Sequence, residues 1–168
     1  MASGLSAVSI PVFVRMLGNL SAMLDRAVAD AEARKFEPSV LLESRLYPDM
    51  FPLRRQVQLA CDFAKGASAR LAGVPVPAFP DEETTVPELK ERIAKVIAFC
   101  QSMSSADVDA GADREVSIKL RDRTVTMPGT AYLNEMAMPN FWFHVATAYA
   151  ILRHNGVPLG KRDFVGAP

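Results

Sequence analysis

Apolar residues recur at intervals of three and four along most of the chain, a spacing that is typical of amphipathic helices. The first such stretch covers about residues 9–35, with Pro11 expected in its first turn, where a proline is tolerated. The second covers residues 52–72 and is followed by Gly73, a residue type that commonly ends helices. Residues 36–51 between them combine prolines with large apolar residues, which predicts a short helix and a turn packed against the other helices.

Two further helices and a hairpin are expected in the second half of the chain. Thr85 and Glu88 stand at the N-cap and N3 spacing of a capping box, so a third helix is predicted to begin there and to run to about residue 103. Over residues 116–127, apolar and polar residues alternate on both sides of a charged turn, which predicts a short β-hairpin. The fourth helix is predicted over residues 130–155. This order predicts an all-α fold, namely an up-and-down four-helix bundle with a small β-hairpin between the third and fourth helices.

Length and composition narrow the class of protein. A chain of 168 residues is expected to form a single domain over residues 1–168 and to bury a core without disulfides. Its 19 basic and 19 acidic residues balance, so no broad basic surface for nucleic acid is expected. Cys61 and Cys100 lie within apolar helical patterns, which predicts buried free thiols. Residues 1–16 have no basic start and no uninterrupted apolar run of spanning length, so we expect no signal peptide, no membrane association and a cytoplasmic location.

The fourth predicted helix is apolar on two opposite sides. One side carries His144 among small and aliphatic residues, and the other carries a stripe of large residues: Met138, Trp142, Val145 and Tyr149. A helix that is apolar on both sides must be covered on both sides. We therefore expect a homodimer that buries this outer stripe. The alternative is that residues 36–51 of the same chain cover it.

The chain contains two histidines, which limits its catalytic and metal-binding chemistry. His144 and His154 are separated by about 15 Å along the axis of one helix, so they cannot bind the same metal ion. His154 falls in the last turn, where a cation interacts favourably with the helix dipole. No serine, cysteine or aspartate is spaced for a nucleophile beside His144, and no phosphate-binding loop or dinucleotide glycine motif is present.

Polar residues accompany His144 on the inward side of its helix. Asn140 lies one turn before it, Thr147 lies three residues after it, and Gln56 of the second helix is placed to point towards it. Such a group is either a satisfied hydrogen-bond network or the floor of a pocket, and the pattern leaves both interpretations open. Pro139 favours the pocket, because a proline inside a helix removes a hydrogen bond and bends the axis, which widens the neighbouring space. On the second helix, Gln58 and Asp62 project further from the buried stripe and are expected to meet solvent.

Three blocks of sequence resemble a known family. They are PVFVRMLGNL, FPLRRQVQLACDFAKGASARLAG and NFWFHVATAYAILRHNGVPLGKRDF. Together they resemble a bacterial family of unknown function that is grouped within the DinB/YfiT-like superfamily of metalloenzymes. The resemblance spans nearly the whole chain, and it implies a four-helix bundle that is often dimeric and lies in the bacterial cytosol.

The resemblance also raises the question of a metal. Many members of the superfamily hold nickel or zinc on three histidines, one on the second helix and two that lie one turn apart on the fourth. By the resemblance, His144 matches the last of the three, and Asn140 stands where the preceding histidine would be. The second helix contains no histidine. Carboxamides are weak ligands for these metals compared with imidazole, so we expect no metal cofactor, and any metal that does bind would bind at His144.

Three functions therefore compete. The leading hypothesis is a DinB-like bundle without the three-histidine site, with a small-molecule pocket lined by His144, Asn140, Thr147 and Gln56. The second is a metal-dependent transferase or hydrolase that uses His144. The third is a structural or interaction protein without a ligand. Neither a substrate nor catalysis itself follows from the sequence.

Overall fold

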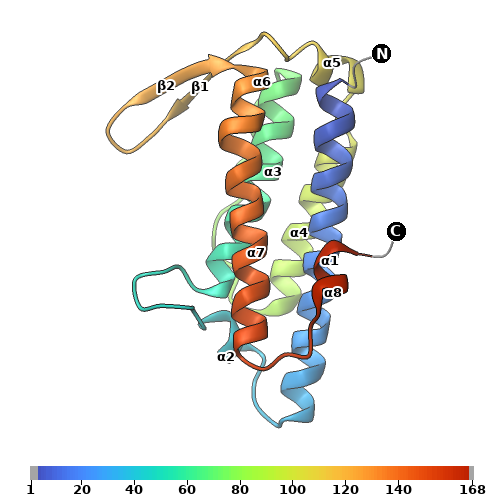
Figure 1. The fold of residues 1–168 in the computed structure, drawn as a ribbon, viewed down its shortest axis with the longest axis vertical. Coiled ribbons are helices and arrows are strands. Elements are labelled where there is room, and N and C mark those ends of the chain that lie inside the picture. Colours follow the sequence, from blue (N-terminus) through green and yellow to red (C-terminus); the bar gives the residue numbers. More distant parts are fainter. Residues whose placement is uncertain (1–3, 167–168) are drawn as a thin grey trace.

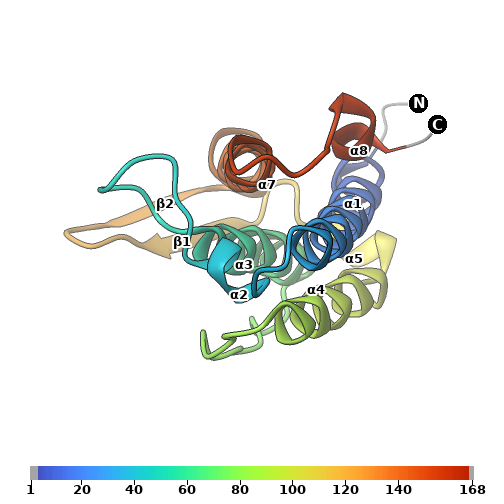
Figure 2. The same cartoon turned by 90° about the horizontal axis from the view of Figure 1, so that it is seen from below.

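The computed structural model describes residues 4–166, and within them four long helices lie lengthwise against one another (Figure 1). They are α1 (Leu5–Ala33), α3 (Leu53–Ala72), α4 (Val86–Gln101) and α7 (Met138–His154). Seen from below, α3 lies between α7 and α4, and α1 lies beside α4 (Figure 2). The protein is thus mostly helical, and each long helix occupies a stretch in which the apolar period predicted one.

The ends of the long helices follow the local sequence. Gly73 ends α3 with a φ of 73°, in the left-handed region that favours glycine. Thr85 and Glu88 form the predicted capping box at the start of α4. The expectation for Pro11 is wrong, because α1 begins at Leu5 and the proline lies inside the helix rather than in its first turn. By the geometry of an α-helix, the carbonyl of Ala7 then lacks its usual donor.

The core lies where the inward faces of the four helices meet. Phe13 of α1 and Phe141 of α7 are fully buried, and their rings pack edge to face at 4.9 Å. Cys61 and Cys100 are both buried and free, as the pattern predicted. Among the described residues, α1 is the one helix long and apolar enough to cross a membrane by length and composition. Part of its surface packs against α4, α7 and the C-terminal segment.

Short elements connect the long ones. The short helix predicted between the first two long helices is α2 (Ser39–Leu42). Strands β1 (Glu115–Lys119) and β2 (Thr124–Pro128) form the predicted antiparallel hairpin, with Ile118 opposite Val125. The hairpin extends sideways from the helices (Figure 1). The sequence pattern did not predict two further short helices, α5 (Ser105–Asp109) and α8 (Lys161–Val165).

The last long helix starts irregularly. The chain enters it through α6 (Gly129–Ala131) and a π-helical segment, η1 (Tyr132–Ala137), before α7 begins. Pro139 sits in the first turn of α7 and has no N–H to donate to the carbonyl of Glu135. The one continuous helix that the pattern predicted is thus interrupted, just before this proline, by a local widening of the helical turn, which is one way to accommodate a missing donor.

The outer stripe of α7 is covered in a way that the pattern did not predict. Phe164 of α8 lies 6.2 Å from the ring of Trp142 and 5.7 Å from the ring of Tyr149, measured between centroids. Val145 is fully buried within the chain, and Met138 and Tyr149 are partly buried. Part of the stripe assigned to a partner chain thus packs against the C-terminal segment of the same chain.

Candidate functional site

A hydrogen bond between α3 and α7 joins the two polar side chains that the sequence placed opposite each other. Nδ1 of His144 lies 2.8 Å from Oε1 of Gln56. Both residues are buried, with 7% and 1% of their surface exposed. Because α3 and α7 pack along their lengths, inward positions on the two helices face each other. This confirms the predicted approach of Gln56 to His144.

A second hydrogen bond made by Gln56 determines which ring nitrogen of His144 carries the proton. Nε2 of Gln56 donates to the backbone carbonyl of Phe51 at 3.0 Å. A carbonyl can only accept, so the amide group of Gln56 must present its oxygen to His144. That oxygen can also only accept, so Nδ1 of His144 carries the hydrogen. In the neutral ring Nε2 is then unprotonated and available as an acceptor.

Aromatic rings enclose this imidazole. Phe63 of α3 stacks on His144 with ring centroids 5.6 Å apart, and Phe143 meets it edge-on at 5.3 Å. Burial, together with the smaller effect of the positive charge of Arg55, lowers the pKa of His144 to about 4. At neutral pH the ring is therefore uncharged, in agreement with the tautomer that Gln56 imposes.

The other two predicted site residues do not join this pair. Nδ2 of Asn140 donates to the carbonyl of Met136 at 2.7 Å, and Oγ1 of Thr147 donates to the carbonyl of Phe143 at 2.7 Å. Both side chains thus bond to the preceding turn of their own helix. Of the four polar side chains that were expected to gather, only Gln56 and His144 bond to each other. Asn140 and Thr147 instead bond to backbone carbonyls of their own helix.

A cavity lies next to the pair. Phe63 forms one of its walls and also stacks on His144, so the cavity and the imidazole share this ring. The cavity has a volume of about 190 Å³ and is lined by Leu59, Asp62, Phe63, Arg70, Ile118, Tyr132 and Met136. Within the described part of the chain, no hydrogen bond reaches Nε2 of His144, and this nitrogen is not among the fully buried unpartnered atoms. It therefore retains contact with solvent at the edge of the aromatic enclosure.

The residues present do not fit the three-histidine metal site of the wider superfamily. Among the described residues, no three His, Cys, Asp or Glu side chains lie close enough together to hold a metal ion. The side chain bonded to His144 is the carboxamide of Gln56, and the amide nitrogen of Asn140 donates to its own helix. One imidazole with neutral carboxamides is a weak donor set for zinc or nickel.

Sequence reasoning missed a second polar cluster, between α3 and α4. Arg92 is almost fully buried and binds Asp62 at 2.8 Å and Glu83 at 2.9 Å. Gln58 is buried and donates to Glu83 at 2.9 Å. The expectation that Gln58 and Asp62 meet solvent is therefore wrong for Gln58 and only partly right for half-buried Asp62. The available signal was Arg92 itself, a cation between Leu89 and Ile93 of the buried stripe.

Comparisons with known proteins agree with the fold. The model of a family described as a domain of unknown function, DUF1993, matches residues 5–165. The crystal structure of a DinB family member protein from Shewanella denitrificans is similar over 98% of this chain and 93% of that chain, with 44% sequence identity and a TM-score of 0.89. No curated protein matches this chain. The chain therefore belongs to the DUF1993 family of domains of unknown function, within the DinB-like fold.

Proposed function

We propose that this DUF1993 protein is an up-and-down four-helix bundle of the DinB type that binds a small, largely apolar molecule beside His144 without a transition metal. The ligand carries a hydrogen-bond donor, which pairs with the unprotonated Nε2 of His144. Its apolar part lies against Phe63, the ring that also lines the neighbouring cavity.

The observation that carries the proposal is the fixed tautomer of His144. The bonds from Phe51 through Gln56 leave one unprotonated nitrogen beside aromatic walls. An acceptor in apolar surroundings selects ligands with a donor, because an unmet donor or acceptor costs free energy when water is excluded. The adjacent volume of about 190 Å³ suits one ring, since an apolar cavity of about 150 Å³ holds benzene.

The same geometry argues against the rival, a metal-dependent transferase or hydrolase. A general base works best when its pKa lies near the working pH, and burial holds the pKa of His144 near 4. The second and third ligands for a metal are carboxamides, so Lewis-acid chemistry at His144 lacks a suitable donor set.

Binding of two matched probes tests the proposal. Phenol carries a donor, and anisole has the same ring with the donor methylated. We expect phenol to bind the wild type and to shift the ¹⁵N resonance of Nε2 in His144, with little effect from anisole. His144→Phe keeps an aromatic ring but loses the acceptor, and it should weaken phenol binding roughly three- to tenfold. Asn140→Ala, a nearby polar change outside the proposed contact, serves as the control.

Equal binding of phenol and anisole, or undiminished phenol binding to His144→Phe, would contradict the hydrogen bond to Nε2. The absence of binding of either probe at millimolar concentration would contradict the pocket and favour a structural or interaction protein.

The homodimer and the cytoplasmic location remain proposals. Because Val145 is buried within the chain, the dimer surface is better assigned to the exposed aromatic rings near His144, including Phe143, which is 54% exposed, and Phe51. Sedimentation at micromolar concentration is expected to show a dimer for the wild type and Trp142→Glu, and a monomer for Phe143→Glu. A monomeric wild type contradicts this assignment. Cell fractionation tests the location.

A further inference from the structure

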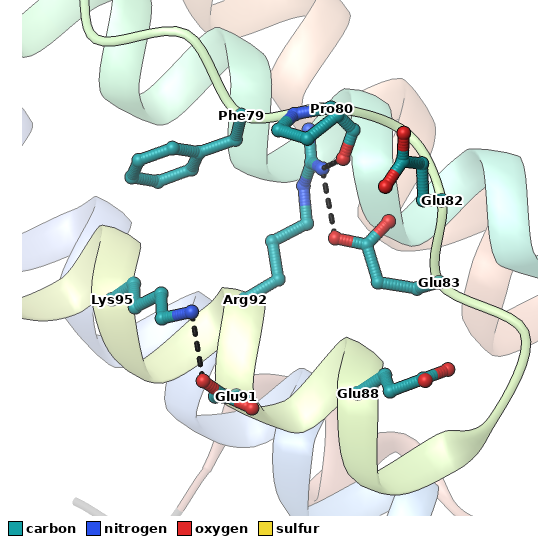
Figure 3. Close-up of a pocket in the computed structure, with 8 residues that line it drawn as sticks. All are labelled: Phe79, Pro80, Glu82, Glu83, Glu88, Glu91, Arg92 and Lys95. Carbon is teal, nitrogen blue, oxygen red and sulfur yellow. Dashed lines mark hydrogen bonds and ion pairs between the residues drawn. The ribbon is translucent and has the colours of Figure 1, made fainter.

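The connector between α3 and α4 is held to the helices mainly by one buried arginine. Residues 74–84, which we call the strap, have no regular secondary structure. Arg92 of α4 reaches up to them with only 2% of its side chain exposed. Its guanidinium donates to the carbonyl of Pro80 at 3.0 Å and pairs with Asp81 and Glu83, each at 2.9 Å. Figure 3 shows the side chain rising from α4 towards Pro80 and Glu83.

Helix α3 adds further polar contacts to the strap. Arg55 pairs with Asp81, and Gln58 donates to Glu83 at 2.9 Å. The ammonium group of Lys65 lies 4.4 Å from the centre of the Phe79 ring. These contacts, together with those of Arg92, join four positions on the strap to two helices.

Little else fastens the strap. Within the described residues, no backbone–backbone hydrogen bond outside regular elements involves residues 75–83. The side chains of Val74 and Val76 are exposed, and Phe79 is the one large side chain of the strap packed against the core. Apolar burial, which holds the long helices together, therefore contributes little here. Attachment of the strap depends chiefly on charge.

Both ends of the strap are suited to act as hinges. At one end, Gly73 closes α3 in a left-handed conformation. At the other end, Thr85 and Glu88 cap the start of α4. Within the described part of the chain, Thr84 is the one strap residue that takes part in these capping bonds. Three prolines between these ends restrict the backbone. The strap itself is therefore stiff. Movement of the strap leaves the caps at the end of α3 and at the start of α4 in place.

The attached state is imperfectly packed. A crevice of about 420 Å³ lies between the strap and α4, lined by Phe79, Pro80, Glu82, Glu83, Glu88, Glu91, Arg92 and Lys95 (Figure 3). Nε of Arg92 is buried and has no hydrogen-bond partner, which costs free energy in the closed arrangement. When the strap lifts, water reaches this nitrogen through the crevice, and Asp62 of α3 still pairs with the guanidinium.

We propose that residues 74–84 form a hinged strap, latched onto α3 and α4 by Arg92, which opens as a unit while the four long helices remain folded. Opening exposes the seam between α3 and α4, including Cys61. This thiol is fully buried, and it lies on the face of α3 that also carries Gln58 and Lys65, three residues before it and four after it.

Labelling of Cys61 measures the opening. In a Cys100→Ser background, Cys61 is the one thiol, and its rate of reaction with a disulfide reagent reports exposure of the seam. Arg92→Met keeps the apolar stem but removes the charge, and it should speed labelling about tenfold or more, the expected effect of losing charged hydrogen bonds. Lys95→Met is the matched control, because Lys95 lines the same crevice and pairs with Glu91 of its own helix. It should leave the rate unchanged.

A second thiol separates local opening from unfolding. In a Cys61→Ser background, the buried Cys100 should react at the same slow rate with and without Arg92→Met. Cleavage after Glu83 by a glutamate-specific protease should rise in parallel with Cys61 labelling. If both thiols accelerate equally, or if neither does, the proposal is overturned. Should Arg92→Met fail to fold, the double variant Asp81→Asn, Glu83→Gln removes the latch from the strap side. Because it also removes the cleavage site at Glu83, it is tested by thiol labelling alone, with the same expected and contradicting rates for Cys61 and Cys100.

Discussion

Acid should destabilise this protein through His144 by an amount that follows from the site. The pKa of His144 is about 4 in the folded chain because the ring is buried, and its ordinary value is 6.5. Between these two values the unfolded chain binds a proton that the folded chain does not, so the free energy of unfolding falls as pH falls through this window. The two values give a loss of about 2 kcal/mol at pH 5 relative to pH 8, and about 3 kcal/mol well below pH 4.

A substitution isolates this contribution from that of the carboxylates. His144→Phe cannot bind the proton, while every other titratable group is retained. The variant is expected to be less stable than the wild type at pH 7.5 by about 1–3 kcal/mol, because Gln56 loses its partner. The difference between the two proteins should then shrink by about 2 kcal/mol at pH 5.

Urea unfolding followed by circular dichroism at pH 7.5, 6.5, 5.5 and 5.0 provides the measurement. A parallel series on His154→Asn, a substitution at the exposed histidine, is the control. A difference between wild type and His144→Phe that stays constant over this range would refute the reasoning, because His144 would then bind its proton equally in both states. The imidazole would in that case be charged or solvated in the folded protein, and the tautomer argument would fail with it.

Further changes have equally specific expectations. In Gly129→Ala the new methyl group would overlap the carbonyl oxygen of Gly111, so we expect a loss of roughly 2–4 kcal/mol. Gly18→Ala, with open space at its Cβ in the middle of α1, should instead add about 0.5–1 kcal/mol; urea midpoints compare the two. Thr85→Ala removes the cap of α4 and should cost about 1 kcal/mol in thermal unfolding. Elemental analysis of untagged protein should find zinc and nickel far below one ion per chain; a stoichiometric ion lost in His144→Ala would contradict this.

The long elements could be read from the sequence because a large apolar stripe has a period that only one secondary structure satisfies. The same argument placed Gln56 opposite His144, since His144 lies on the inward stripe of its helix and Gln56 lies at the edge of the inward stripe of the other. The short helices α5 and α8 are only five residues long, too short for a period to emerge. The π-helical segment lies just before Pro139. A missing donor is compatible with either a bend or a widened turn, so the sequence pattern alone could not predict which of the two forms.

The cluster around Arg92 illustrates a different limit. Its partners Asp81 and Glu83 come from a segment without periodicity, so no pattern places them above α4. Nor does composition show that the long side chain of Arg92 turns inward, since such side chains usually carry their charge to solvent. Asn140 and Thr147 were placed on the correct side of their helix, but each had a backbone carbonyl within reach, which satisfied it locally.

The π-helical segment over Tyr132–Ala137 gives this chain a place where its length can change by one residue. A π-type hydrogen bond spans one residue more than an α-type bond. Deletion of the exposed Asn134 can therefore convert the segment into ordinary α-helix without rotating what lies on either side. The same deletion in the middle of α7 would turn every following side chain by about 100°. Related chains that differ in length within this helix should thus carry the insertion or deletion between residues 132 and 137.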